Sequence, residues 1–225
     1  MIQYILTDIE GTTTSVSFVY DTLFPYFKDN LTEFVNTHAE KAEVKTQLEK
    51  TKAWAKTEEN LSLDNQGVID LLLDWTAQDV KNALLKDMQG MVWAQGYAES
   101  TLLGHVYEDV LPKLKEWKDK GLKMGVYSSG SIAAQKLIFG KSILGDLNAY
   151  FSHNFDTGIG HKREVNSYTA IANEIGILPK EILFLSDVEA ELEAAAEAGM
   201  QTVQLVRPGT EASTKHKTVT SFGEI

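Results

Sequence analysis

Apolar residues recur with two different periods along the 225-residue chain. Residues 2–6 form a short apolar run that leads into Thr7 and Asp8, a pattern typical of a buried strand. Residues 17–100 carry helical spacing almost throughout, because apolar side chains return every three or four positions. After Gly104, helical segments alternate with short apolar runs. This alternation predicts a doubly wound α/β fold, in which helices cover both faces of a mainly parallel sheet.

The long helical stretch falls between the first predicted strand and the rest of the predicted sheet. Because helices cannot extend a sheet, we expect this stretch to form a domain of its own. We therefore predict an α/β core built from residues 1–14 and 106–225, with a helical cap domain inserted over residues 15–105.

Charge and composition narrow the range of partners. The formal net charge is −11, so most of the surface is expected to repel nucleic acid and anionic membranes. The chain has no cysteine, which excludes disulfides, thiolate metal sites and cysteine nucleophiles. The N-terminal residues do not resemble a signal peptide, and no apolar run is long enough to span a bilayer. We expect a soluble, cytoplasmic protein that acts on a small molecule.

Polar side chains follow several predicted strands at the point where each strand ends. Asp8 and Glu10 follow the first strand. Ser128 and Ser129 follow a second strand, and Asp187 follows a later one. In open parallel sheets, ligands bind at the carboxyl ends of the strands, so we expect these groups to converge. Carboxylate and hydroxyl oxygens of this kind suit Mg²⁺.

Lys162 and Glu191 complete the candidate set. Lys162 supplies a positive charge between the second and third polar segments, and Glu191 lies one helical turn beyond Asp187. Taken singly, each residue has a commoner structural explanation. An aspartate at a strand end often caps a helix, and a lysine is usually a solvated surface charge. Their joint appearance, in this order and at strand ends, favours a functional site.

The segment Asp8-x-Glu10-Gly11-Thr12 resembles the first motif of the haloacid dehalogenase superfamily. The positions of the second, third and fourth motifs are taken by Ser128, Lys162 and Asp187-x-x-x-Glu191. General phosphatases of this superfamily carry aspartate where this chain has Glu10. That departure is similar to the enolase-phosphatase family, as are residues 88–97, 126–137 and 160–164. The resemblance covers residues 8–208 and implies the superfamily's α/β core with an inserted cap.

The resemblance implies a monomeric, Mg²⁺-dependent enzyme of methionine salvage. Its substrate is 2,3-diketo-5-methylthiopentyl-1-phosphate, which is first enolised and then dephosphorylated. Asp8 is the expected nucleophile, since a carboxylate at a rigid strand end can form an aspartyl-phosphate. Glu10 lies two residues further on and is suited to protonate the leaving oxygen and then to activate water. Which base removes the carbon-bound proton is left open.

The remaining candidates are expected to bind the substrate or the metal. Phosphate binding is predicted for Ser128, Ser129 and Lys162, through hydroxyl groups and a point charge. The resemblance implies that Mg²⁺ is held by Asp8, Asp187 and the backbone carbonyl of Glu10. Glu191 is expected to orient either Lys162 or a metal-bound water.

Three other functions fit parts of the same pattern. A plain phosphatase acting on another small phosphate ester shares all the core motifs. A dehalogenase fits less well, because it has no alkoxide leaving group that needs an acid such as Glu10. A phospho-accepting signalling module would lack the helical insertion. Within that insertion, Gln89, Trp93 and Tyr97 share one helix face, which is explained equally by packing and by substrate contact.

Overall fold

The computed structural model describes residues 1–225 and divides them into two compact units. Unit 1 comprises Met1–Phe18 and Leu103–Ile225, and unit 2 comprises Val19–Leu102. The two segments that connect the units are bonded to each other within unit 1. Thr14 Oγ1 donates a hydrogen bond to the carbonyl of His105 at 2.6 Å. None of the helices combines the length and apolar character that a bilayer span requires.

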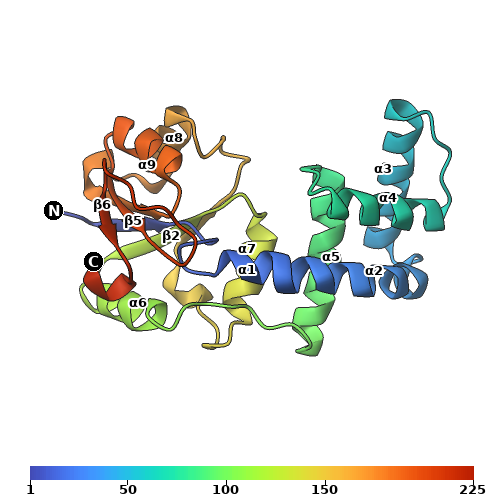
Figure 1. The fold of residues 1–225 in the computed structure, drawn as a ribbon, viewed down its shortest axis with the longest axis horizontal. Helices are drawn as coiled ribbons and strands as arrows, with labels where there is room; N and C mark the ends of the chain where they lie inside the picture. Colours follow the sequence, from blue (N-terminus) through green and yellow to red (C-terminus); the bar gives the residue numbers. More distant parts are fainter. The chain divides into compact units, whose positions relative to one another are not determined.

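Unit 1 is built on one six-stranded sheet with the order β3-β2-β1-β4-β5-β6. Figure 1 labels β2, β5 and β6 of this sheet. Every neighbouring pair is parallel, which confirms the predicted α/β class. The strands are β1 (Tyr4–Thr7), β2 (Lys123–Tyr127), β3 (His153–Phe155), β4 (Ile182–Ser186), β5 (Gln201–Leu205) and β6 (Lys217–Val219). The helices are α1 (Val16–Phe18), α6 (Val110–Asp119), α7 (Ile132–Gly140), α8 (Val165–Ile175) and α9 (Glu189–Glu197).

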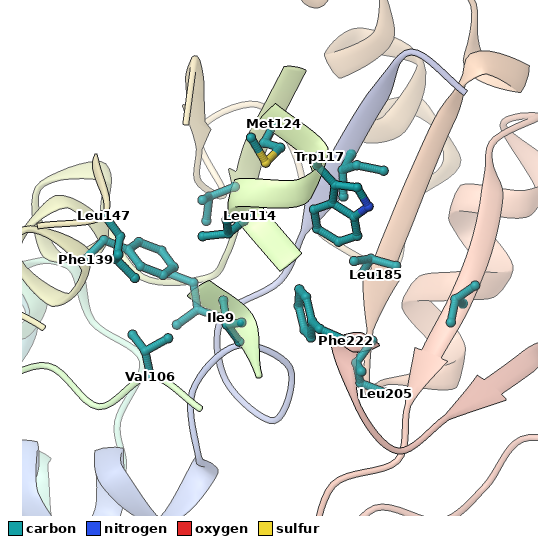
Figure 2. Packing of buried hydrophobic residues seen from close by; sticks show 14 of the residues in the cluster. Ile9, Val106, Leu114, Trp117, Met124, Phe139, Leu147, Leu185, Leu205 and Phe222 are labelled. Carbon is teal, nitrogen blue, oxygen red and sulfur yellow. The ribbon is translucent and has the colours of Figure 1, made fainter. Parts of the chain in front are cut away.

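The two faces of this sheet bury separate hydrophobic clusters, because successive strand residues point to opposite sides. Ile5 of β1 packs in the cluster that includes residues of α6 and α7. Its neighbours Tyr4 and Leu6 pack in the cluster that includes residues of α8 and α9. Figure 2 shows the first cluster, where Trp117 and Phe222 lie with ring centroids 5.7 Å apart. Burial on both faces holds β1 rigidly and fixes where the chain leaves it.

The far edge of the sheet differs from expectation. Strand β6 was not predicted, because two of its three residues are polar and exposed. It is an edge strand that pairs only with β5, so it does not need the apolar pattern of a buried strand. The pattern of residues 150–155 suggests a strand, but β3 begins only at His153, since a 3₁₀ turn occupies Asn148–Tyr150.

Unit 2 is entirely helical, as the period of its apolar residues predicts. A π turn at Val19–Leu23 leads into α2. The helices are α2 (Phe24–His38), α3 (Ala42–Glu58), α4 (Asn65–Ala77) and α5 (Ala83–Glu99). Side chains cap the N-termini of α4 and α5: Asp64 accepts the Gly67 N–H, and Asn82 accepts the Leu84 N–H. The helices enclose one apolar core of their own, in which Trp54 and Trp75 pack edge to face.

Candidate active site

Three of the predicted motifs lie side by side because their strands are neighbours. Strand β1 lies between β2 and β4, so Asp8 leaves the sheet between Ser128 and Asp187. The Asp8 N–H donates to the carbonyl of Leu185 at 2.8 Å, which continues the β1–β4 pairing to the start of the site. The chain builds β2 and β3 on one side of β1, then β4 and β5 on the other. Asp8 and Asp187 therefore lie at the switch point, where open α/β sheets bind ligands.

The loop after Asp8 is held tightly by its own backbone. The N–H groups of Thr12, Thr13 and Thr14 all donate to the carbonyl of Ile9, at 3.2, 2.9 and 2.8 Å. Gly11 within this loop has φ of +68°, which favours glycine. A Cβ at Gly11 would lie 2.2 Å from an oxygen of the Asp187 carboxylate. The Asp187 side chain thus lies directly against this loop, and only glycine leaves room for it.

Lys162 joins two carboxylates in the interior of unit 1. Its Nζ lies 2.7 Å from Asp8 Oδ1 and 2.7 Å from Glu191 Oε2. The three side chains are only 5%, 6% and 11% exposed, so their charges are poorly screened by water. Burial by itself lowers the pKa of Lys162, but the charges of Asp8 and Glu191 outweigh it, and the pKa is raised. Lys162 is therefore a fixed positive charge beside Asp8.

The segment that carries Lys162 is anchored by side chains of neighbouring elements. Tyr168 OH donates to the carbonyl of Lys162 at 2.6 Å, and Tyr127 OH donates to the carbonyl of Gly160 at 2.9 Å. Ser167 Oγ donates to the carbonyl of His161 at 2.8 Å. These bonds turn the segment between β3 and α8 inward. A residue that usually remains at the surface is thereby brought to the strand ends.

Glu191 is tied to the same group of residues from the first turn of α9. Ser186 Oγ donates to Glu191 Oε2 at 2.9 Å. Burial raises the pKa of Glu191, and the charge of Asp8 adds to this, while Lys162 and Ser186 act in the opposite direction. Of the two partners predicted for Glu191, the structure shows contact with Lys162.

The Asp187 carboxylate lies in surroundings that disfavour its negative charge. The pKa of Asp187 is raised to about 6. Burial is the largest cause, the negative charge of Asp8 is the second, and the charge of Glu10 adds a smaller amount. Its Oδ1 is buried and has no hydrogen-bond partner. A cation placed between Asp8 and Asp187 would relieve both the repulsion and the missing bond. No cluster of three or more acidic, histidine or cysteine side chains is arranged for a metal, so other ligands must come from backbone, substrate and water. This donor set fits Mg²⁺, which usually takes one or two carboxylates and keeps several waters.

The two predicted phosphate-binding serines differ in their surroundings. Ser128 is 3% exposed and its Oγ accepts the Gly130 N–H at 3.3 Å. Ser129 is exposed. At the start of α7, the Ile132 N–H donates to Asp156 Oδ2 at 3.3 Å, so that helix N-terminus is partly engaged by the protein itself.

Sequence reasoning did not single out a glutamine that organises the serine loop. Gln135 is 1% exposed, and its Nε2 donates to the carbonyls of Gly130 at 2.9 Å and Phe155 at 2.8 Å. Its Oε1 accepts from Asn154 Nδ2 at 3.0 Å. Gln135 thus fastens the loop after β2 to the end of β3. A single amide on an otherwise apolar helix face was the signal available in the sequence.

Arg207 is a second residue of the site's surroundings that the sequence did not single out. Its Nε donates to the carbonyl of Thr12 at 3.2 Å, and its Nη2 lies 3.0 Å from both carboxylate oxygens of Asp109. The guanidinium lies 4.0 Å from the ring centroid of Tyr107. Arg207 therefore ties the loop after Asp8 to the segment before α6.

Within the helical unit, the proposed face of Gln89, Trp93 and Tyr97 is largely internal. Gln89 and Tyr97 are buried, and Trp93 Nε1 donates to the carbonyl of Leu23 at 2.9 Å. This bond supports a packing role for Trp93.

Comparison with known proteins identifies the family. The family model of haloacid dehalogenase-like hydrolases matches residues 2–199. The chain is 55% identical over 225 residues to "Enolase-phosphatase E1" of Picosynechococcus sp., covering 100% of this chain and 98% of that protein. The chain belongs to the enolase-phosphatase E1 family. The protein of the same name from Azotobacter vinelandii is 53% identical over 224 residues, covering 100% of this chain and 97% of the relative. Membership of the enolase-phosphatase E1 family confirms the predicted enzyme class and removes the signalling-module alternative.

Solved structures agree with this assignment. The UTR4 protein from Saccharomyces cerevisiae is 34% identical and superposes with a TM-score of 0.84, with 100% of both chains covered. CbbY from Rhodobacter sphaeroides, solved in complex with phosphate, has a TM-score of 0.62 at 17% identity, covering 100% of this chain and 96% of that chain. The second comparison shows the fold alone. Both share the fold of this chain over its whole length.

Proposed function

We propose that this protein is a bifunctional, Mg²⁺-dependent enolase-phosphatase of methionine salvage. It converts 2,3-diketo-5-methylthiopentyl-1-phosphate to the acireductone 1,2-dihydroxy-3-keto-5-methylthiopentene and phosphate. Relatives more than 50% identical over the full chain support the reaction. The single structural observation that carries the proposal is the buried contact of Lys162 with Asp8. It combines a carboxylate nucleophile and a positive charge at the switch point of the sheet.

Asp8 is the proposed nucleophile of the dephosphorylation. Its carboxylate attacks phosphorus, the bond to the ester oxygen breaks, and an aspartyl-phosphate forms. Glu10 donates a proton to the departing oxygen and then accepts one from the water that hydrolyses the aspartyl-phosphate. Lys162, Ser128 and Ser129 bind the phosphate oxygens and offset their negative charge. Glu191 holds Lys162 in place, since it contacts Nζ at 2.7 Å.

We propose that Mg²⁺ is held by Asp8, Asp187 and the backbone carbonyl of Glu10. Once bound, the ion neutralises phosphate charge and polarises the phosphoryl oxygens. The buried, unpartnered Oδ1 of Asp187 supports this placement. The carboxylate also lies against Gly11, on the same loop as Glu10.

Enolisation precedes dephosphorylation in the proposed reaction. The carbon-bound proton is acidified by the adjacent carbonyl groups, and the positive charge of Lys162 is suited to stabilise the enolate. The helical unit, Val19–Leu102, is proposed to act as a cap that excludes water during both steps. We propose that the protein acts as a monomer on this small phosphate ester.

The direct test is to supply the diketo phosphate with Mg²⁺ and to follow the enol product and free phosphate separately. We expect an enol phosphate to appear before phosphate, and chelation of Mg²⁺ to stop phosphate release. Release of phosphate from simple esters, with the diketo compound left untouched, would replace this proposal with that of a plain phosphatase. Size-exclusion chromatography with light scattering tests the monomer.

A further inference from the structure

A buried glutamine reaches the site from the opposite side to Lys162. Gln204 is the fourth residue of β5, is 1% exposed and pairs in register with Ser186 of β4. Its Nε2 donates to the carbonyl of Asp187 at 2.8 Å and to the carbonyl of Glu211 at 3.1 Å. Its Oε1 accepts the Ser213 N–H at 2.7 Å. Both amide protons are therefore in use, and the side chain is fixed in one orientation.

These bonds restrain the peptide that follows Asp187. The Asp187 carbonyl is bound by Gln204, and the next N–H, that of Val188, donates to Ser186 Oγ at 3.1 Å. Both polar groups of this peptide are thus held by side chains rather than by the sheet. Ser186, before Asp187, is held in the sheet, and the peptide after Asp187 is held by side chains. The direction in which the Asp187 side chain leaves the backbone is therefore restrained.

The restraint on the Asp187 backbone opposes the electrostatic repulsion that acts on its side chain. The Asp187 carboxylate lies against Gly11 and near the negative charge of Asp8, and its Oδ1 has no partner. Repulsion from Asp8 favours movement of Asp187 away from the position in which both carboxylates can share a cation. A rigid backbone opposes that movement before the cation arrives.

The same amide shapes the neighbouring cavity. A pocket of about 430 Å³ is lined by Asp187, Glu189, Gln204 and the turn at residues 208–211. Gln204 holds this turn through Glu211 and the segment after it through Ser213. Loss of the Gln204 amide therefore frees one wall of the pocket together with the Asp187 backbone.

We infer that Gln204 is a positioning residue that preorganises Asp187 to bind the divalent cation. The inference rests on the proposed function, because that function places the cation between Asp8 and Asp187. Residues that orient metal ligands typically contribute about 10–100-fold to metal affinity. An apolar residue of similar length is thus expected to weaken Mg²⁺ binding without changing any ligand.

The test is calorimetric titration of the full-length protein with MgCl₂. For Gln204→Met we expect the Kd for Mg²⁺ to rise at least about 10-fold. The matched control is Gln201→Met, on the same strand. Gln201 Nε2 also donates to a backbone carbonyl, that of Lys180, but at the opposite end of β5. Its Kd should stay within about twofold of the wild-type value.

The readouts separate positioning from a purely structural role. If Gln204 only supported the fold, Gln204→Met would lower the free energy of unfolding but leave the Kd for Mg²⁺ of the folded protein unchanged. An unchanged Kd would overturn the inference. Gln204→Asn, whose shorter amide cannot reach Asp187, should weaken Mg²⁺ binding in the same way.

If neither variant folds, NMR of the wild type decides. The Gln204 side-chain amide signals should shift on addition of Mg²⁺ while those of Gln201 do not, and unmoved Gln204 signals overturn the inference. A wild type that binds no Mg²⁺ would contradict the cofactor assignment itself.

Discussion

The ammonium group of Lys162 lies 2.7 Å from a carboxylate oxygen of Asp8, and both side chains are almost completely buried. A buried ion pair is maintained only when each charge has a partner, since desolvation of either ion is costly. Here Lys162 has a second partner in Glu191. Lys162, Asp8 and Glu191 together therefore place one ammonium group between two carboxylates. A further cation beside Asp8 would be stabilised by the excess of carboxylates.

Replacement of Asp8 by asparagine keeps the shape of the side chain and removes the nucleophilic charge. We expect phosphate release to fall by several orders of magnitude. Rapid quenching of the wild type during turnover, followed by borohydride reduction, should convert the aspartyl-phosphate at Asp8 to homoserine, which mass spectrometry detects. The exposed Asp119→Asn provides a matched control with unchanged turnover. An Asp8 that is never modified during turnover would mean that water attacks the phosphorus of the substrate directly.

Replacement of Lys162 by methionine leaves Asp8 and Glu191 as buried carboxylates without a cation. Breaking a buried ion pair costs about 3–5 kcal/mol of unfolding free energy. Burial already raises the pKa of Glu191, with a further contribution from Asp8, and loss of Lys162 raises it more. A carboxyl group with a raised folded-state pKa stabilises most at low pH, and this stability is lost as pH rises through that pKa.

Urea unfolding of Lys162→Met should therefore show a larger deficit at pH 8 than at pH 5. Adding Glu191→Gln removes one of the two uncompensated charges and should recover part of the loss at pH 8. An equal deficit at both pH values would indicate lost packing rather than lost charge compensation.

Asp187→Asn should stabilise the protein in the absence of divalent cations. Burial and the charge of Asp8 raise the pKa of Asp187 to about 6. Because this lies above its unfolded value, ionisation of Asp187 lowers stability as pH rises through about 6. The gain from asparagine should thus be small near pH 4 and reach about 3 kcal/mol at pH 8 in chelator. Added Mg²⁺ should raise the Tm of the wild type but not that of the variant. A variant stabilised equally by Mg²⁺ would show that Asp187 is not a ligand.

Glu10→Gln keeps the backbone carbonyl but cannot exchange protons. Loss of a positioned acid–base group typically costs about 10²–10⁴-fold, so hydrolysis should slow by that amount. If another group removes the carbon-bound proton, enolisation should suffer less and the enol phosphate should accumulate. Absorbance of the enol and a phosphate assay measure the two steps separately. Equal loss of both steps would make Glu10 the shared base.

Gln135→Met should disturb the serine loop. The carbonyls of Gly130 and Phe155 would lose a buried donor, at a cost of about 1–3 kcal/mol of stability. We expect the KM for the phosphate ester to rise by more than the decrease in kcat, because Ser128 would be less well placed. Gln47→Met is the control: Gln47 is 3% exposed and donates to the carbonyl of Leu84 in the helical unit. That variant should lose stability with an unchanged KM, and the same behaviour in Gln135→Met would contradict a role in the loop.

Local periodicity in the sequence determined most of the architecture. The apolar positions at Lys123–Tyr127 and at Val165–Ile175 carry the periods of a strand and a helix, and the structure has those elements there, because apolar positions at a fixed period require a matching buried face. Parallel neighbours also present their carboxyl ends at one edge of the sheet. The proximity of Asp8, Ser128 and Asp187 therefore follows from their positions after strands.

The tertiary structure alone decided which groups touch. The segment before α8 turns inward because Tyr127 and Tyr168 bind its carbonyls, and no local pattern encodes those contacts. The sequence places Gln204 in a strand, but only the folded chain brings its amide to the Asp187 carbonyl. Arg207 and the carbonyl of Thr12 are 195 positions apart in the chain. Such contacts depend on the paths of several loops at once, whereas the period of a helix or strand depends only on neighbours in the sequence.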